Sequence, residues 1–113
     1  MKKILLMLVA LIATSFSAMA EDIYIVAGSE ELCGTAWDCT DLNNKMTDNG
    51  DGTYSKTFTN VAAMNGYQFK VTKNGTEWYG DVAGNNITFN VTTACDVTIT
   101  FNATTFKSTV TGS

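Results

Sequence analysis

The chain of 113 residues contains no histidine, no arginine and no proline. Without histidine it lacks the most common general base of active sites and a principal ligand of structural zinc. Its formal net charge is −4 at pH 7. Nucleic acid and anionic lipid surfaces both attract basic proteins, so this charge argues against either as a partner. The absence of proline leaves every strand interior uninterrupted.

Cysteine is scarce as well, with Cys33, Cys39 and Cys95 the only three. One disulfide and one free thiol is the simplest arrangement in an exported protein, and three pairings are open. We favour Cys33 with Cys39, because they lie close in the sequence and bracket a short loop. No cofactor or metal site is predicted. The acidic run 48–52 resembles a calcium loop, but Phe58 stands where the last acidic ligand is required, so a hairpin turn is expected there.

Residues 1–20 have the features of a secretory signal peptide. Two lysines precede an apolar run over 4–12, and a small-x-small cleavage site ends at Ala20. The run is shorter than the roughly 20 residues of a membrane span, and no lipoprotein cysteine follows it. We therefore expect a secreted or periplasmic protein whose mature part, 21–113, is a single domain. Removing the two lysines from the charge of −4 leaves −6 on that domain.

The mature sequence is β throughout. Short runs alternate apolar and polar residues, and clusters of Asn, Gly and Asp separate them. So many short strands in about 90 residues are typical of an all-β, two-sheet antiparallel sandwich. The predicted strands are 23–27, 53–59, 67–72, 87–91, 97–101 and 105–111.

An aromatic residue and a lysine near the middle of the chain are the strongest functional signal. Lys70 lies on the outward face of its predicted strand, and Trp78 follows the next turn among glycine and charged residues. A sugar ring stacks on an aromatic face, and a long donor beside it reaches a hydroxyl. Tryptophan in a small sandwich is more often part of the core, lysine is usually only solvated, and Asn85 also suits a turn. Trp37 lies in the long irregular segment 27–47, and such a loop is usually functional or mobile.

The order and spacing of several segments resemble the Ig-like starch- and glycogen-binding modules of pullulanases and branching enzymes. The β-subunit module of the AMP-activated protein kinase is a relative of these modules. The similarity is greatest to the bacterial pullulanase-associated and gut starch-utilisation versions. The segments that carry the resemblance are Tyr24–Ser29, Trp37–Asp38, Lys45–Tyr54, Tyr67–Val71, Trp78–Asp81, Gly84–Phe89 and Asp96–Phe101.

The resemblance implies an immunoglobulin-like sandwich of six to eight short strands that holds an α-glucan. Its sugar-binding residues fall on Trp37, Lys70, Trp78 and Asn85, and we expect Tyr79 to extend the aromatic platform. One departure is that eight residues separate Gly28 from Trp37, where the glycogen-binding version has a compact turn.

The expected function is therefore a secreted, non-catalytic module that binds α-1,4-glucan (starch, glycogen or maltooligosaccharide), with a surface or secreted amylolytic enzyme as partner. The alternative is an Ig-like structural or protein-interaction module that keeps the fold without binding sugar. The two differ in whether Trp37 and Trp78 are exposed on one face or buried.

An enzyme is not predicted. The sequence has no histidine base, no serine elbow and no glycine-rich phosphate loop. Carboxylate pairs such as Asp38 with Asp41, or Glu77 with Asp81, lie in short loops of a domain too small for a deep cleft.

Overall fold

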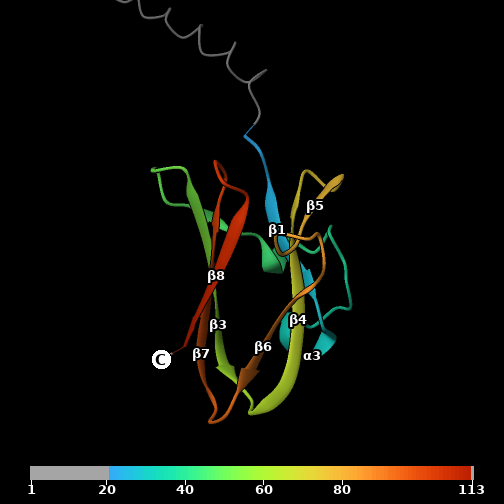
Figure 1. The fold of residues 1–113 in the computed structure, drawn as a ribbon, viewed down its shortest axis with the longest axis vertical. Coiled ribbons are helices and arrows are strands. Elements are labelled where there is room, and N and C mark those ends of the chain that lie inside the picture. The colour runs from blue at the N-terminus through green and yellow to red at the C-terminus, as the bar shows by residue number, and fades with distance from the viewer. Residues whose placement is uncertain (1–20, 113) are drawn as a thin grey trace, which may run out of the picture.

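The computed structural model describes residues 21–112 as two antiparallel sheets packed face to face (Figure 1). The first sheet contains β1 (Tyr24–Gly28), β4 (Met64–Lys73), β5 (Glu77–Tyr79) and β6 (Ile87–Val91). The second contains β2 (Thr47–Asp48), β3 (Thr53–Val61), β7 (Cys95–Asn102) and β8 (Lys107–Gly112). This arrangement confirms the predicted Ig-like sandwich. The predicted signal peptide lies outside the described residues.

The core between the sheets follows from the two-residue period of the strands. In β4 the side chains of Tyr67, Phe69 and Val71 point inward and are fully buried. In β7 the side chains of Ile99 and Phe101 point inward in the same way. Burial of each such side chain contributes about 1.5–3 kcal/mol, so these alternating residues supply most of the driving force for folding.

The six predicted strands are all present, with ends shifted by a few residues. The acidic run forms the predicted hairpin turn, because Asn49 N donates to Thr53 O (3.0 Å) and β2 pairs with β3 across it. Two strands were missed, β2 and β5, which have only two and three residues. Among residues 21–112 no helix is long and apolar enough to cross a membrane.

One edge of β4 is shared by two strands. β5 pairs with Val71–Lys73 and β6 pairs with Met64–Phe69, while β1 occupies the opposite edge. β5 and β6 therefore continue one another along the same edge, and the connection between them forms a break in that strand. Lys70 of β4 is the residue that faces the break.

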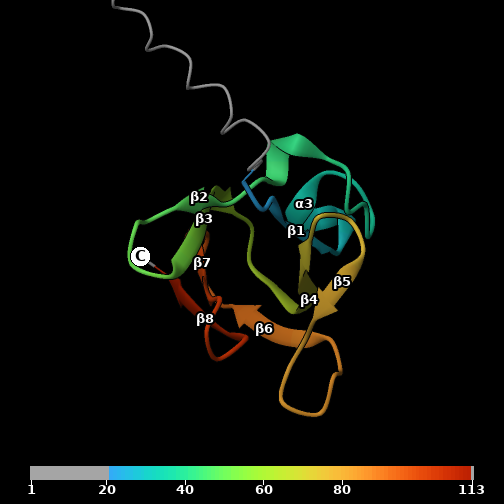
Figure 2. The same ribbon diagram turned by 90° about the horizontal axis from the view of Figure 1, so that it is seen from above.

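A long connection between β1 and β2 first closes the edge of the sandwich beside β1, where Leu32 and Cys33 join the core, and then crosses the outer side of the first sheet. It contains a one-turn helix, α3 (Glu30–Cys33), and a 3₁₀ turn, η2 (Leu42–Asn44). Seen from above in Figure 2, it lies beside β1 and close to β5. We call residues 34–46 the crossing loop. Its cover explains why Ile25 and Thr72 are buried although they point away from the core.

Candidate functional site

Strand register places the predicted lysine and tryptophan on one face. Thr72 of β4 lies opposite Ile25 of β1 and Trp78 of β5, and Lys70 lies opposite Ala27. Directly opposed residues of an antiparallel pair point to the same side, as do residues two apart in one strand. Lys70 and Trp78 therefore share the outer face of the first sheet. Trp78 is 40% exposed, so its ring does not lie between the sheets.

A glycine lets Lys70 and the break in the strand come close together. Gly80 follows β5, next to Lys70, and is buried. A Cβ atom on Gly80 would lie 2.0 Å from the carbonyl oxygen of Asn85 and 3.1 Å from Cε of Lys70. Only glycine allows this approach, because real Cβ contacts are never that short. The stem of Lys70 thus lies against the backbone of the break.

The break is a small loop closed on itself by Asp81. Asp81 N donates to Asn85 O, and Asp81 Oδ1 accepts from Ala83 N and Asn85 N, each at 2.9 Å. These bonds fix the backbone of Asn85 and leave its side chain exposed to solvent. The predicted asparagine is therefore held close to Lys70.

A second amide pair lies in the same region and was missed in the sequence. Asn86 Nδ2 donates to Gln68 Oε1 at 3.2 Å. Gln68 lies two residues before Lys70 in β4 and so points to the same outer face. The outward position of Gln68 in the alternating strand could have identified it as a candidate from the sequence. The polar part of the site therefore includes Gln68 and Asn86 as well as Lys70 and Asn85.

The crossing loop brings Trp37 to this side of the molecule. Trp37 N donates to Gly28 O (2.9 Å) at one edge of the sheet, and two residues later Cys39 Sγ lies 3.8 Å from Gly75 O in the β4–β5 turn. The chain thus crosses the outer face from β1 toward the turn that precedes Trp78. Trp37 has a positive φ of 53° and is 37% exposed. Both tryptophans are partly exposed, and the path of the crossing loop brings the backbone of Trp37 to the side that carries Trp78.

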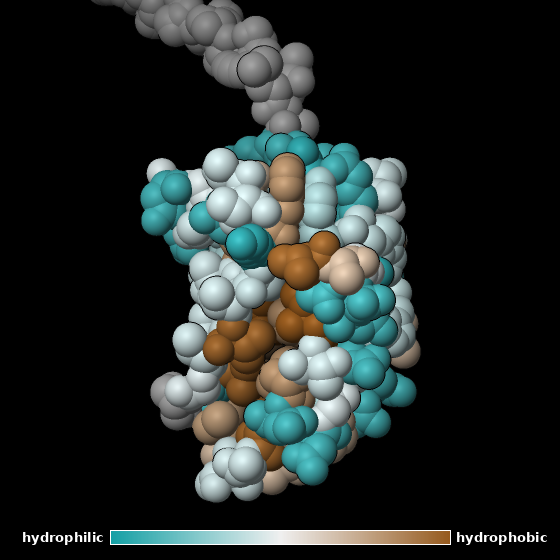
Figure 3. Space-filling model, viewed as in Figure 1, coloured by the Kyte–Doolittle hydropathy of each residue, from teal (hydrophilic) through white to brown (hydrophobic). Residues whose placement is uncertain are grey.

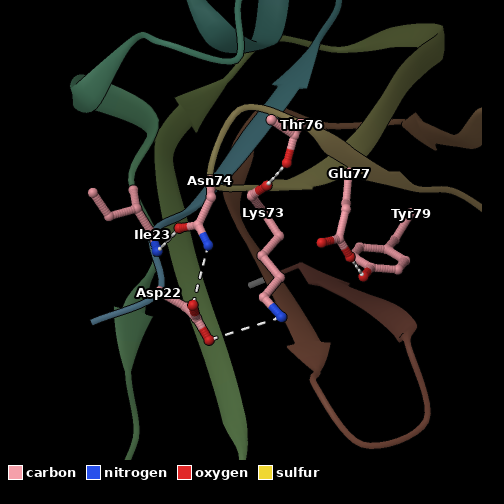
Figure 4. Close-up of polar contacts among 7 residues, drawn as sticks. All are labelled: Asp22, Ile23, Lys73, Asn74, Thr76, Glu77 and Tyr79. Carbon is pink, nitrogen blue, oxygen red and sulfur yellow. Dashed lines mark hydrogen bonds and ion pairs between the residues drawn. The ribbon is translucent and has the colours of Figure 1, made fainter. Parts of the chain in front are cut away.

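The turn before Trp78 is tied to the N-terminal segment (Figure 4). Asn74 Oδ1 accepts from Ile23 N (2.8 Å), and Asn74 Nδ2 donates to Asp22 Oδ1 (3.1 Å). Lys73 Nζ lies 3.8 Å from Asp22 Oδ2. Asn74 and Gly75 both have positive φ, as a tight hairpin turn requires. These contacts fix the turn, and therefore the position of Trp78.

Tyr79 does not extend the Trp78 platform, contrary to the prediction. It lies opposite Val71, so it faces the other side of the sheet from Trp78. Its ring stacks on Phe106, with centroids 4.9 Å apart and planes at 8°. Figure 4 shows its hydroxyl directed at Glu77, to which it donates a hydrogen bond. That hydrogen bond, with partial burial, raises the pKa of Tyr79 to about 12.

The predicted Cys33–Cys39 disulfide is wrong, because both residues are free thiols. Cys33 ends α3 with its side chain buried, and its Sγ lies 3.8 Å from Val26 O. Cys39 instead lies across the crossing loop at Gly75. Burial raises the pKa of the Cys33 thiol to about 11. The error came from treating residues 33–39 as a simple loop, whereas the helical turn directs Cys33 inward.

The carboxylate of Asp38 is held in its charged form by a neighbouring threonine. Thr40 donates to Asp38 Oδ1 through its hydroxyl (2.6 Å) and its backbone N–H (2.8 Å), and these bonds hold the pKa of Asp38 below its usual value. A general acid for glycoside cleavage needs a raised pKa. Within residues 21–112 there is no group of three or more side chains suited to hold a metal ion.

Comparisons with known proteins give one family and one fold. Residues 23–108 match the family model "Pullulanase X25 domain". Among solved structures, "Pullulanase from Bacillus acidopullulyticus" matches with a TM-score of 0.69 and 18% sequence identity. The match covers 80% of this chain and 11% of that chain, so this chain spans about a tenth of that pullulanase. At this identity the likeness concerns the fold. No curated protein matches the chain.

Proposed function

Because the chain belongs to the pullulanase X25 domain family, we propose that it is an exported, non-catalytic module that binds α-1,4-glucan (starch, glycogen or maltooligosaccharide). The binding surface is the outer face of the first sheet. Trp78 and Trp37 form the stacking platform, and Lys70 and Asn85 orient the sugar through its hydroxyl groups. The observation that carries this proposal is that Lys70 and the partly exposed Trp78 share this outer face, toward which the crossing loop brings Trp37.

The chemistry of these groups suits a pyranose ring. A glucose residue has a flat C–H surface that packs on an indole, and burial of a large aromatic side chain contributes a few kcal/mol. The ammonium group of Lys70 supplies three donors, and the Asn85 amide supplies both donors and an acceptor for neighbouring hydroxyls. Because the Gly80–Asn86 break and the tied β4–β5 turn hold these residues in place, little ordering is left to oppose binding.

The site is shallow, so we expect weak to moderate affinity for a short oligosaccharide. A module of this kind acts by keeping a polysaccharide near a catalytic partner. An amylolytic enzyme is the expected partner, since the family match is to a domain named for pullulanase. Weak individual binding is sufficient for this task, because one polysaccharide presents many sites.

Affinity electrophoresis in gels that contain amylopectin tests the proposal. The unmodified protein is expected to be retarded, and Trp78→Ala to lose most of the retardation. Lys70→Met should reduce it less, and the matched control Lys56→Met should leave it unchanged, because Lys56 lies over the Phe58 ring in the other sheet. If the unmodified protein runs freely, the function is wrong and the interaction-module alternative takes its place.

A further inference from the structure

A second aromatic surface lies at the edge of the sandwich, next to Trp78. A groove of about 580 Å³ separates the Gly80–Gly84 connection from the turn between β7 and β8. Three of the six residues with large exposed apolar side chains in 21–112 line it, namely Trp78 (40%), Val82 (90%) and Phe106 (48%). Figure 3 shows apolar side chains on the surface along the seam where β6 and β8 face each other. So dense a gathering on a small protein marks a binding surface.

Phe106 adopts an energetically unfavourable backbone conformation in this groove. Its φ is +62°, a backbone conformation that glycine and asparagine adopt far more readily than an aromatic residue. The turn around it is well fixed, because Phe106 N donates to Asn102 O (2.7 Å) and Asn102 Oδ1 accepts from Thr104 N (2.8 Å). The ring stacks on Tyr79 and leaves about half of its own surface in water. Strain kept at an exposed ring indicates a role other than making the turn.

Polar groups accompany the aromatic ring. Asp81, Lys107 and Ser108 also line the groove. Within the described residues the hydroxyl oxygen of Ser108 is buried and has no hydrogen-bond partner. An apolar ligand would remove water from Asp81 and Lys107 without replacing its hydrogen bonds, whereas a sugar offers a C–H face to Phe106 and hydroxyls to these two side chains. The lining therefore favours a carbohydrate.

The groove is continuous with the outer face. Trp78 lies at the border of the two surfaces, because its ring is on the outer face while the residue also lines the groove. The loop closed by Asp81 lines the groove on one side and presents Asn85 near Lys70 on the other. We propose that the groove is a second subsite for the same α-glucan chain, with Phe106 as its platform. This inference rests on the proposed function. A chain of several glucose units that is bound at Trp78 continues around the edge of the sheet to Phe106, which a curved α-1,4-linked chain can do.

Isothermal titration calorimetry with maltotriose and maltoheptaose tests the subsite. The unmodified protein should bind the longer sugar at least threefold more tightly. Phe106→Asn should remove this advantage and leave maltotriose binding unchanged. Asparagine suits the positive φ, so the variant should keep its fold, which thermal unfolding checks. Leu42→Asn is the matched control, because Leu42 is also exposed but does not line the groove.

Val82→Asp provides a second variant at a side chain exposed enough to change without loss of the fold. It places a second carboxylate beside Asp81 and should produce the same selective loss for maltoheptaose. If both variants keep the preference for the longer sugar, the subsite is wrong while the outer-face site stands. If the unmodified protein binds neither sugar, the proposed function itself fails.

Discussion

The two sheets of this sandwich present very different outer faces. On the second sheet the outward residues are mostly threonine and serine, and they face water in rows across β3, β7 and β8. Thr57 and Thr98, for example, lie opposite each other with hydroxyl oxygens 2.8 Å apart. On the first sheet the crossing loop covers the outward residues, so Ile25, Ala27 and Thr72 are buried.

The contrast between the two outer faces distinguishes features that the sandwich fold requires from features that it does not. A polar outer face on one side of an antiparallel sheet is the ordinary solution, and the second sheet follows it. The first sheet instead carries an extra layer, a broken strand and two partly exposed tryptophans, Trp78 in the sheet and Trp37 in the layer. A core alone does not demand these features. The side chains that remain accessible on the covered sheet are therefore the best candidates for function.

The largest expected effect comes from Gly80→Ala in the broken strand. The new Cβ would meet the Asn85 carbonyl oxygen at 2.0 Å and the Asn85 carbonyl carbon at 2.9 Å, and backbone atoms cannot move aside as a flexible side chain can. We expect a loss of about 1–3 kcal/mol in the free energy of unfolding, measured with urea. Gly112→Ala in the other sheet is the control, because its Cβ would meet no atom closer than the Cys95 sulfur at 3.2 Å. Equal losses in the two variants would contradict this account.

Alkaline pH should lower the stability of the protein through the buried thiol of Cys33. Burial raises the pKa of Cys33 from 9.0 to about 11, so its stabilising contribution is complete below pH 9 and is lost as pH rises through 11. In this window the free energy of unfolding should fall by at most about 1.4 kcal/mol per pH unit. Tyr79, whose pKa is raised from 10.0 to about 12, acts in the same direction between pH 10 and pH 12.

Chemical denaturation between pH 8 and pH 11 measures this slope, and Cys33→Ala should flatten it. A thiol reagent gives an independent readout at neutral pH. Cys39 and Cys95, which are partly exposed, should react in the folded protein, while Cys33 should react only on unfolding. Rapid labelling of all three thiols in the native state would show that Cys33 is not protected.

A smaller effect is expected from paired threonine substitutions on the two outer faces. Thr72 is buried and donates to Ile25 O at 2.9 Å, so Thr72→Val should lower stability by about 1 kcal/mol through loss of this bond. Thr57→Val on the water-facing outer face of the second sheet should change the stability by less than about 0.5 kcal/mol. Thermal unfolding of both variants gives the comparison. If Thr57→Val costs as much, the contrast in burial between the faces does not govern stability.

Residue periodicity predicts the inner layers of this fold better than its edges. The alternation in 67–72 and 97–101 identifies long strands whose inward side chains are core, and both are found in the structure. β5 was missed because three residues between turns show no periodicity, so Trp78 was predicted to lie outside any strand. Its placement in β5 also determines that its neighbour Tyr79 faces the opposite side.

The candidate site could be predicted only in part for a similar reason. Lys70 is assigned to the outer face by alternation within one strand, which is a local property. The nearness of Asn85 to Lys70 depends on pairing between β4, β5 and β6 and on the tight fit at Gly80, neither of which a single sequence reveals. Phe106 gave no signal, because its exposure arises from the backbone conformation of one turn residue.

The break between β5 and β6 is also a place where the loop sequence is expected to vary while the sheet stays the same. Because Asp81 N bonds to Asn85 O at the base of the loop, we expect that the residues between them can change in number and kind without shifting the register of β5 or β6. Libraries with longer or more polar inserts at 82–84 could then be screened for altered ligand preference on an unchanged scaffold. Residues 82–84 are therefore a suitable position for sequence changes, both in evolution and in protein engineering.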